Sequence, residues 1–223
     1  MADALKHHAL TADLPESIIF DAGVLYKNFV SPAEPGDRIG ATRGGSEFAL
    51  NAEFRDIEVD GVPGPVKGLR RLVRVAPTMT INLLSLTKDN ILLAIPGASA
   101  EAGETDFTDY DVITGGQITD ESYFDNLALV ARTGSGKPVI FVIENALADG
   151  NLSLSFADQD EANPSITFQA HFDPADLESA EDLFENLPFK IYYPKKAAVS
   201  DPPDQGGGGD EGGGGDEGGG GEG

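Results

Sequence analysis

The segment YFDNLALVARTGSGKPVIFVI, residues 123–143, predicts a β-hairpin. Two runs rich in apolar residues flank the turn-forming residues 133–137, which is the pattern of two strands joined by a short glycine-containing loop. The second run, from Val139 to Ile143, is apolar at every position, so a strand here needs cover on both faces. We therefore expect it inside a β-sandwich or beneath a subunit contact, with Ile140 and Val142 packing under a neighbouring copy.

Alternating apolar and polar residues predict strands on both sides of this hairpin. Residues 151–156 and 166–172 alternate with a period of two, and a polar loop joins them, so a second hairpin is expected. Residues 73–83 also alternate, and Pro77 within them favours an edge position or a β-bulge.

The apolar residues of segment 48–59 change phase. They stand at even positions from Phe48 to Phe54, whereas Ile57 and Val59 stand at odd positions. A strand with this change of phase predicts a β-bulge, here near residues 55–56.

Helix is scarce in the sequence. Thr87 is a suitable N-cap for a short helix over residues 88–95, which Pro96 and Gly97 end. Asp173 and Pro174 are a suitable cap and first-turn pair for a second helix, through about residue 180. The pattern as a whole predicts a mostly β protein, a β-sandwich with one or two short helices.

Composition divides the chain into three parts. We predict a flexible N-terminal arm over residues 1–16, one β-sandwich domain over residues 17–194, and a disordered tail over residues 195–223. From Asp201 onward the sequence contains only Gly, Pro, Asp, Glu and one Gln, with a repeat of six residues, which is typical of a flexible coil. Within the domain, residues 31–45 and 98–107 are polar connections, and loops as long as residues 31–45 are often functional or mobile.

Charge and cysteine content exclude several classes of function. The chain has no cysteine, which excludes disulfides, thiolate nucleophiles and cysteine-ligated metals. The formal net charge is −23, so the protein is not expected to bind nucleic acid by neutralising phosphates. The sequence shows no signal-peptide pattern, and its longest apolar run, residues 139–143, is too short to cross a membrane. A soluble protein is expected.

The segment TGSGKP, residues 133–138, is similar to the end of a phosphate-binding P-loop. The complete motif needs a glycine at position 131 and a hydroxyl at position 138, where this sequence has Ala131 and Pro138. A strand is also predicted where a helix should begin. We interpret the segment as a hairpin turn, with no nucleotide or other cofactor expected.

Neither the histidines nor the acidic clusters predict a catalytic or metal site. His7 and His8 lie in the predicted flexible arm, and His171 is expected on the solvated face of a strand. The clusters at residues 106–111 and 158–160 lack the glycine and the terminal glutamate of a calcium-binding EF-hand loop. We interpret them as solvated acids, and no catalytic residue is predicted.

One basic cluster interrupts this acidic chain, formed by Lys67, Arg70, Arg71 and Arg74. It is either a solvated strand edge or a socket for acidic groups of a neighbouring copy. The sequence alone leaves both interpretations open.

The order of segments resembles the tail tube proteins, or major tail proteins, of long-tailed, siphovirus-type bacteriophages. The resemblance covers roughly residues 17–193. It rests on the following stretches: GATRGG (40–45), FRDIEVDG (54–61), GPVKGLRR (64–71), the strand ending INLLSLT (81–87), the short helix DNILLA (89–94) and the closing hairpins.

This resemblance implies a structural virion protein and not an enzyme. It implies a tail-tube β-sandwich that forms hexameric rings, in which strands of six copies close an inner β-barrel. Rings then stack into the conduit through which the genome leaves, with the segment around residues 31–45 reaching the adjacent ring. The implied partners are further copies of the chain and the tape-measure, tail terminator and distal tail proteins, in the virion tail after assembly in the host cytoplasm.

Strand edges and net charge are both compatible with this expectation. Open strand edges favour association unless they are paired, and closure of a ring pairs them. A negatively charged conduit also does not bind the DNA that passes through it. The predicted subunit contacts are Arg43, Lys67, Arg70, Arg71, Ile140 and Val142.

Other functions stay open at this point. Another virion ring or capsid-decoration protein has the same general features. A cell-surface or carbohydrate-binding β-sandwich is expected to expose flat aromatic platforms, although this chain has no Trp. A nucleotide-using enzyme depends on the incomplete P-loop and requires measurable nucleotide affinity.

Overall fold

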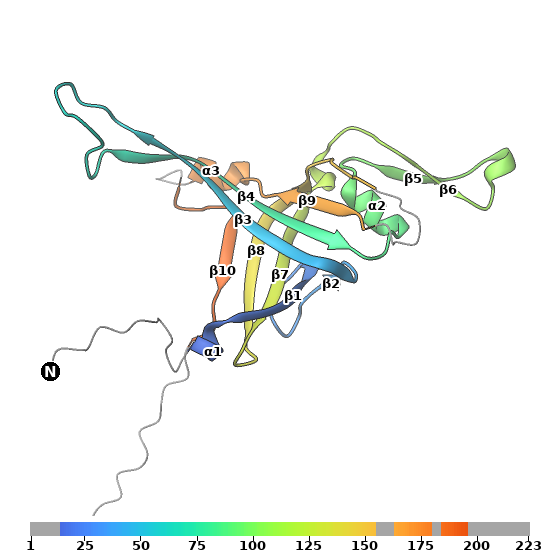
Figure 1. Ribbon diagram of the computed structural model, residues 1–223. Coiled ribbons are helices and arrows are strands. Elements are labelled where there is room, and N and C mark those ends of the chain that lie inside the picture. The colour runs from blue at the N-terminus through green and yellow to red at the C-terminus, as the bar shows by residue number, and fades with distance from the viewer. Residues whose placement is uncertain (1–13, 155–162, 180–183, 196–223) are drawn as a thin grey trace, which may run out of the picture.

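A computed structural model describes residues 14–154, 163–179 and 184–195 of the protein (Figure 1). It is mostly β with antiparallel pairing throughout. In chain order the elements are α1 (Leu14–Ser17), β1 (Ile19–Lys27), β2 (Asp37–Arg38), β3 (Thr42–Asp56), β4 (Arg70–Leu83), α2 (Lys88–Ala94), β5 (Ser99–Ala102), η1 (Thr105–Phe107), β6 (Asp111–Thr114), η2 (Asp120–Ser122), β7 (Phe124–Thr133), β8 (Pro138–Ala148), β9 (Ser165–Gln169), α3 (Pro174–Ser179) and β10 (Phe189–Tyr192).

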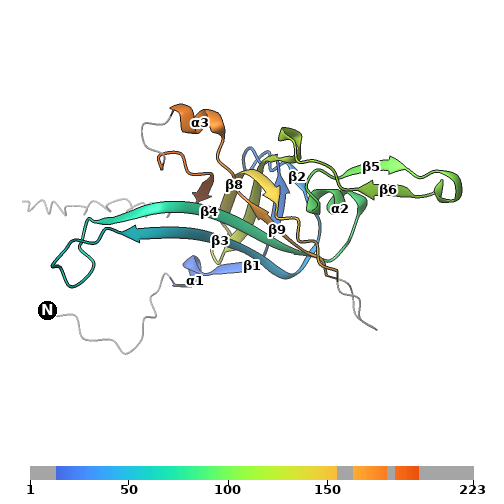
Figure 2. The same cartoon turned by 90° about the horizontal axis from the view of Figure 1, so that it is seen from above.

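Eight of the strands form one sheet in the order β2-β1-β7-β8-β9-β4-β3, with β10 also paired to β8. Strand β8 connects the two halves of this sheet: residues 140–143 pair with β10 and residues 147–148 pair with β9. Between them Asn145 has a positive φ of 46°, a conformation that bends the strand away from regular pleating. The sheet consequently curls over on itself, and within the described residues it does not close into a barrel (Figure 2).

The curled sheet encloses one main hydrophobic core. The core takes residues from both halves of the sheet, including Leu25 and Leu127 on one side and Met79, Ile81 and Phe168 on the other, all between 0% and 1% exposed. Phe48 on β3 closes the core through ring contacts with Phe141 (5.2 Å between centroids) and Phe189 (6.3 Å).

The hairpin predicted over residues 123–143 is confirmed as β7 and β8. Its two strands pair from Arg132 opposite Pro138 to Phe124 opposite Ala146. Residues 133–137 form the turn, where the Thr133 N–H donates to the Lys137 carbonyl at 2.9 Å. The segment similar to a P-loop is therefore a hairpin turn followed by a strand, as the sequence predicted.

The second predicted hairpin is confirmed in its later strand, and its earlier strand lies partly outside the described residues. Its later strand is β9, but β9 pairs with β4 and β8. Of the earlier strand, residues 151–154 contribute a single isolated bridge between Ser153 and Ser165, and residues 155–156 lie outside the described residues. On the side of β9 away from β4, residues 168–169 pair with β8, the Thr167 carbonyl accepts from the Asp149 N–H at 2.8 Å, and Ser165 bridges to Ser153.

Pro77 was predicted at an edge of the sheet or in a β-bulge, but it lies in neither: it is fully buried in β4, at the residue where the pairing of β4 with β9 ends. Strand β4 pairs with β9 over residues 78–82, and the Pro77 carbonyl accepts the last bond on that side, from the Ala170 N–H at 3.0 Å. From Ala76 back to Arg70, β4 has β3 as its one partner strand. The missing N–H of proline is therefore tolerated where the neighbouring strand ends.

A bulge was predicted in β3 near residues 55–56. The structure has a bulge between Glu53 and Phe54, and the extra residue belongs to the partner strand, β4. Glu53 is opposite Arg74 and Phe54 is opposite Leu72, so Val73 of β4 is the extra residue. The change of phase in β3 beyond Asp56 has a different cause, because β3 ends there and residues 57–69 form a loop.

Both predicted helices are present. The Thr87 side chain accepts a hydrogen bond from the Asn90 N–H at the start of α2, and the Asp173 carboxylate accepts one from the Ala175 N–H at the start of α3. Residues 98–107, predicted as a polar connection, instead contain β5 and η1. They form one side of a two-stranded hairpin with β6.

Candidate assembly interface

Two long projections extend from the curled sheet in opposite directions (Figure 1). One is the end of the β3–β4 hairpin, residues 51–77, which we call the arm. The other is the β5–β6 hairpin, residues 98–115, which we call the ribbon. At about 3.3 Å per residue, the paired strands of the arm alone extend roughly 20 Å.

The arm has an apolar face that continues the core face of the sheet. Phe54 and Leu72 are opposite each other on this face, beyond the point at which β9 ends. Leu50 is 47% exposed and Phe54 is 54% exposed. A two-stranded hairpin is marginally stable in water by itself, so an apolar face without cover is suited to a contact with another molecule.

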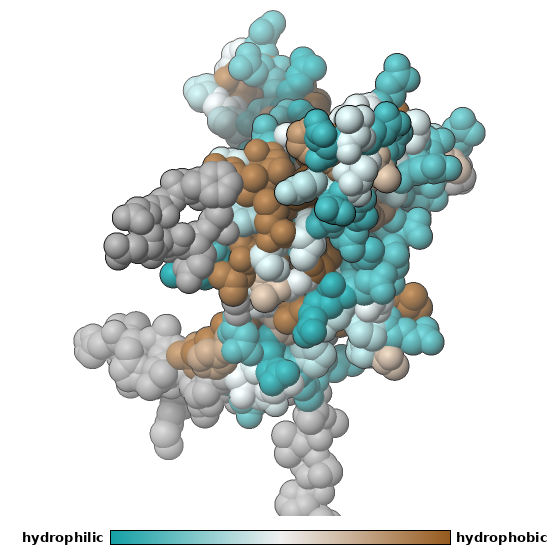
Figure 3. Space-filling model, turned by 90° about the vertical axis from the view of Figure 1, so that its right-hand side faces the viewer, coloured by the Kyte–Doolittle hydropathy of each residue, from teal (hydrophilic) through white to brown (hydrophobic). Residues whose placement is uncertain are grey.

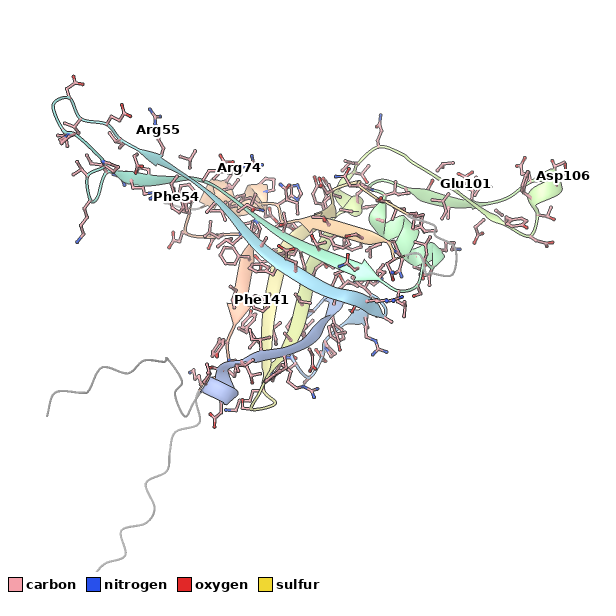
Figure 4. The ribbon with its side chains drawn as sticks, viewed as in Figure 1. Phe54, Arg55, Arg74, Glu101, Asp106 and Phe141 are labelled. Carbon is pink, nitrogen blue, oxygen red and sulfur yellow. The ribbon has the colours of Figure 1, made fainter. Side chains whose placement is uncertain are left out.

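The opposite face of the arm is charged. Arg55 is directly opposite Arg71, and the adjacent pair on the same face is Glu53 with Arg74, whose charged groups lie 3.8 Å apart. Figure 4 shows Arg55 and Arg74 on one side of the arm and Phe54 on the other. In the described part of the chain, neither Arg55 nor Arg71 forms an ion pair.

Arg70 contributes to the arm itself. Its guanidinium lies 4.6 Å above the centre of the Phe54 ring and 3.8 Å from the Asp56 carboxylate. These contacts join the two strands near the tip by a cation–π interaction and a weak surface ion pair.

The ribbon is acidic, and its tip is aromatic. It carries no basic residue and the following acids: Glu101, Glu104, Asp106, Asp109 and Asp111. At the tip, Phe107 and Tyr110 are 62% and 66% exposed. Their rings contact each other edge to face, with 6.1 Å between the ring centroids. Figure 4 places Glu101 and Asp106 along this projection, on the side of the molecule away from the arm.

The base of the ribbon is fixed to the body. The Lys88 ammonium donates to the Asp111 carboxylate at 2.7 Å, and this bond raises the pKa of Lys88 above its ordinary value. Gly97 has a φ of +69°, and a Cβ added there would lie 2.5 Å from the Gln117 carbonyl oxygen. Figure 3 shows hydrophobic patches between polar surface on this side of the molecule, which carries α2 and the ribbon.

The predicted contact residues fall into three groups. Lys67, Arg70 and Arg71 are all exposed and belong to the arm. Arg43 is exposed at the other end of β3. Ile140 and Val142 are 4% and 5% exposed within a single copy, where they pack with Phe29 and Ala128. Their apolar character therefore already has an explanation inside the chain.

Within residues 31–45, predicted to reach an adjacent ring, residues 37–39 bond to β1 of their own sheet and residues 42–45 begin β3. Strand β2 pairs with β1, and the Ile39 N–H donates to the Leu25 carbonyl at 3.0 Å. Ile39 is 8% exposed and belongs to the core. The arm does project from the sheet (Figure 1), although its local sequence pattern had predicted no projection. Its signal was the loop of residues 57–69 with two prolines and three glycines after an unusually long strand.

The curled sheet leaves strand edges open. Within the described residues β3 pairs with β4 alone, so one side of this 15-residue strand has no hydrogen-bonded neighbour, although β3 also packs against β1. Strand β10 likewise pairs with β8 alone, and Ile191 and Tyr192 next to its open edge are 47% and 52% exposed. The Lys190 ammonium and the Glu144 carboxylate hold β10 on β8, and this hydrogen bond raises the pKa of Lys190.

His171 differs from its predicted solvated position. It lies just beyond β9, half-buried, with its ring edge to face against Tyr123 at 5.2 Å and its Nδ1 3.2 Å from the Asn145 carbonyl oxygen. The acids of residues 106–111 are exposed, as expected, whereas residues 158–160 lie outside the described residues. Among the residues that the structure describes, no cluster of His, Asp and Glu could hold a metal ion.

No protein-family model matches this chain, and no curated protein matches its sequence significantly. No helix in the described ranges is long and apolar enough to cross a membrane. The arm, the ribbon and the open strand edges are the features of this protein that bear on its function.

Proposed function

We propose that this protein is a structural subunit that assembles with copies of itself into the tail tube of a long-tailed bacteriophage. The observation that carries the proposal is the open edge of β3. An unpaired strand edge of this length is a template for a strand of another chain, and most proteins shorten or cover such edges. In this protein β3 is long and has no hydrogen-bonded neighbour on one side within the described ranges, and the apolar face of the adjacent arm is also exposed.

The arrangement of the edges favours a ring. The open edges of β3 and β10 belong to different strands of the same sheet, so a contact between them is heterologous and repeats from copy to copy. In this proposal the curled sheet is the β-sandwich of a ring subunit, and six copies complete an inner β-barrel. The number six comes from the family resemblance.

The charge of the chain is compatible with a conduit for DNA. A net charge of −23 opposes binding of the phosphate backbone, so a genome can pass without adhering. The role is structural and not enzymatic. The further partners are the tape-measure, tail terminator and distal tail proteins, in the virion tail after assembly in the host cytoplasm.

A single residue of β3 permits a sharp test of edge pairing. Leu50 is opposite Pro77, whose carbonyl points to Ala170 on the other side of β4. The Leu50–Pro77 pair is therefore not hydrogen-bonded, and the backbone groups of Leu50 point to the open edge. Leu50→Pro removes a donor from that edge without removing a bond between β3 and β4.

The experiment is electron microscopy and sedimentation of the purified full-length chain over a range of concentrations. Stacked rings with a central channel are expected for the wild type. Leu50→Pro is expected to prevent them, whereas Leu50→Ala, which keeps the N–H, should still assemble. A wild-type protein that stays monomeric at every concentration, with or without the other tail proteins, would overturn the proposal.

One observation favours a second candidate, a carbohydrate-binding module. Phe107 and Tyr110 are exposed at the ribbon tip, where an aromatic contact with a sugar ring is accessible. Their ring planes are inclined by 69°, however, so the two rings do not form one flat platform. Glycan binding that is lost in Tyr110→Ala, in a protein that does not self-assemble, would support this candidate over the tube.

A further inference from the structure

We propose that the acidic tip of the ribbon of one copy contacts the Arg55–Arg71 face of the arm of the next copy. This inference rests on the proposed self-assembly and names the two surfaces that meet. It is carried by three observations: the charge of each projection, the like-charge pair on the arm, and the opposite directions of the two projections.

The two projections are electrostatically complementary. The arm, residues 51–77, contains Arg55, Lys67, Arg70, Arg71 and Arg74 against Glu53, Asp56, Glu58 and Asp60, a net charge of 5 − 4 = +1 in a strongly acidic chain. The ribbon, residues 98–115, contains five acids and no base, a net charge of −5. Complementary patches of this kind direct association and fix its register.

The charges of each projection are distributed differently within the chain. On the arm, Arg70 and Arg74 have acidic neighbours within 3.8 Å. The arm loop also carries Lys67, Glu58 and Asp60 without an ion-pair partner among the described residues, but on the paired strands of the arm the cations without an acidic neighbour are Arg55 and Arg71. On the ribbon, Asp111 pairs with Lys88 at its base. Every other acid of the ribbon is without a cationic neighbour among the described residues, including Asp106 and Asp109 at the tip.

The pairing of Arg55 with Arg71 is unfavourable within one copy. Two like charges directly opposite each other on one face of a hairpin are destabilising. An acidic group from another molecule removes this repulsion, and a guanidinium binds a carboxylate with two parallel hydrogen bonds. The exposed rings of Phe107 and Tyr110 beside the acids add the aromatic surface on which guanidinium groups stack.

A second copy is the occupant that the geometry supports. The arm and the ribbon leave the body on opposite sides, so they cannot meet within one chain (Figure 1). Between copies, the contact of an arm with a ribbon is heterologous and can be repeated without limit or closed into a ring. Every copy in such an array uses both of its projections.

Charge exchange tests this contact directly in the full-length protein. Variant A is Arg55→Glu with Arg71→Glu, and variant B is Asp106→Lys with Asp109→Lys. Each is expected to raise the concentration needed for assembly at least about tenfold, because like charges then face each other. The combined variant AB restores complementarity with reversed polarity and is expected to assemble again.

A matched control separates this contact from net charge. Arg132→Glu with Lys137→Glu makes the same charge change as variant A at the β7–β8 turn, away from both projections. The control is expected to assemble like the wild type. Circular dichroism of each variant verifies the fold, and Arg55→Gln with Arg71→Gln, which should weaken assembly less than variant A, provides a milder test if variant A does not fold.

The outcomes distinguish this inference from the proposed function. Loss of assembly in A and B, with recovery in AB, supports the contact. Wild-type assembly of variant A, loss of assembly in the control, or failure of AB to recover overturns the contact while the self-assembly of the wild type still stands. If the wild type itself never assembles, the proposed function fails, and this inference fails with it.

Discussion

Arg55 of β3 and Arg71 of β4 are directly opposite each other in the ladder of the arm, on the same face. Two guanidinium groups in this relationship repel each other, and one substitution would exchange the repulsion for attraction. The Arg55–Arg71 pair therefore lowers the stability of a single copy. We propose that the pair forms a contact between copies.

The first prediction concerns this pair. Arg71→Glu places a carboxylate opposite Arg55, so the free energy of unfolding of the monomer should rise by about 0.2–1 kcal/mol. The same substitution should weaken assembly. Thermal unfolding below the assembly concentration measures the first effect, and sedimentation measures the second. A variant that is less stable than the wild type would show that the two arginines do not repel each other.

The second prediction concerns the tip of the ribbon. An added Cβ at Gly103 would lie 2.2 Å from the Phe107 carbonyl oxygen, so Gly103→Ala should open the tip without any change of charge. We expect faster hydrogen exchange in β5 and β6 and weaker assembly, with an unchanged melting temperature of the body. Gly115→Ala is the control, because nothing lies within 4 Å of its added Cβ. Equal exchange in the two variants would contradict the prediction.

The third prediction concerns the bend in β8. Asn145 has a φ of 46°, and its side-chain amide donates to the His171 carbonyl at 3.3 Å. Asn145→Ala loses the hydrogen bond and places alanine in a left-handed conformation, so it should lower the free energy of unfolding by about 2–3 kcal/mol. Asn145→Gly loses the bond alone and should be the more stable variant in chemical denaturation. The reverse order would mean that backbone conformation does not matter here.

The fourth prediction concerns the core. Phe168 is fully buried and contacts the ring of Phe124 edge to face at 6.3 Å. Phe168→Ala should lower the free energy of unfolding by about 3–5 kcal/mol, because it leaves a cavity between the two halves of the sheet. Phe54→Ala, on the exposed face of the arm, should change it by less than about 1 kcal/mol. Urea denaturation of both variants makes the comparison, and a similar loss in both would place Phe54 in the core of the monomer.

The fifth prediction concerns pH. The hydrogen bond to Glu144 raises the pKa of Lys190 in the folded protein above its ordinary value of 10.5. The resulting stabilisation is complete below the unfolded pKa and is lost as the pH rises through the raised folded pKa. The wild type should therefore lose more stability than Lys190→Gln between pH 9 and pH 12. Denaturation curves at several alkaline pH values test this, and parallel losses would exclude a contribution from Lys190.

The local sequence determined the strands and their buried faces. Alternation in residues 73–83 and the apolar run 139–143 predicted strands that are present, and Thr87 and Asp173 predicted helix starts that are present. These features depend on neighbouring residues, because side chains of a strand alternate between two faces and a cap binds backbone groups of the next turn.

Tertiary structure decided which surfaces stay open. Residues 31–45 had the composition of a long loop, and pairing with β1 holds residues 37–38 of it on the sheet. Residues 51–77 project because β9 ends opposite Thr78, and the bulge at Val73 sets the register that brings Arg71 opposite Arg55. Register and strand neighbours depend on pairing between distant segments. Local patterns therefore cannot specify which strand edges lack a partner. In this protein the proposed self-assembly depends on those open strand edges.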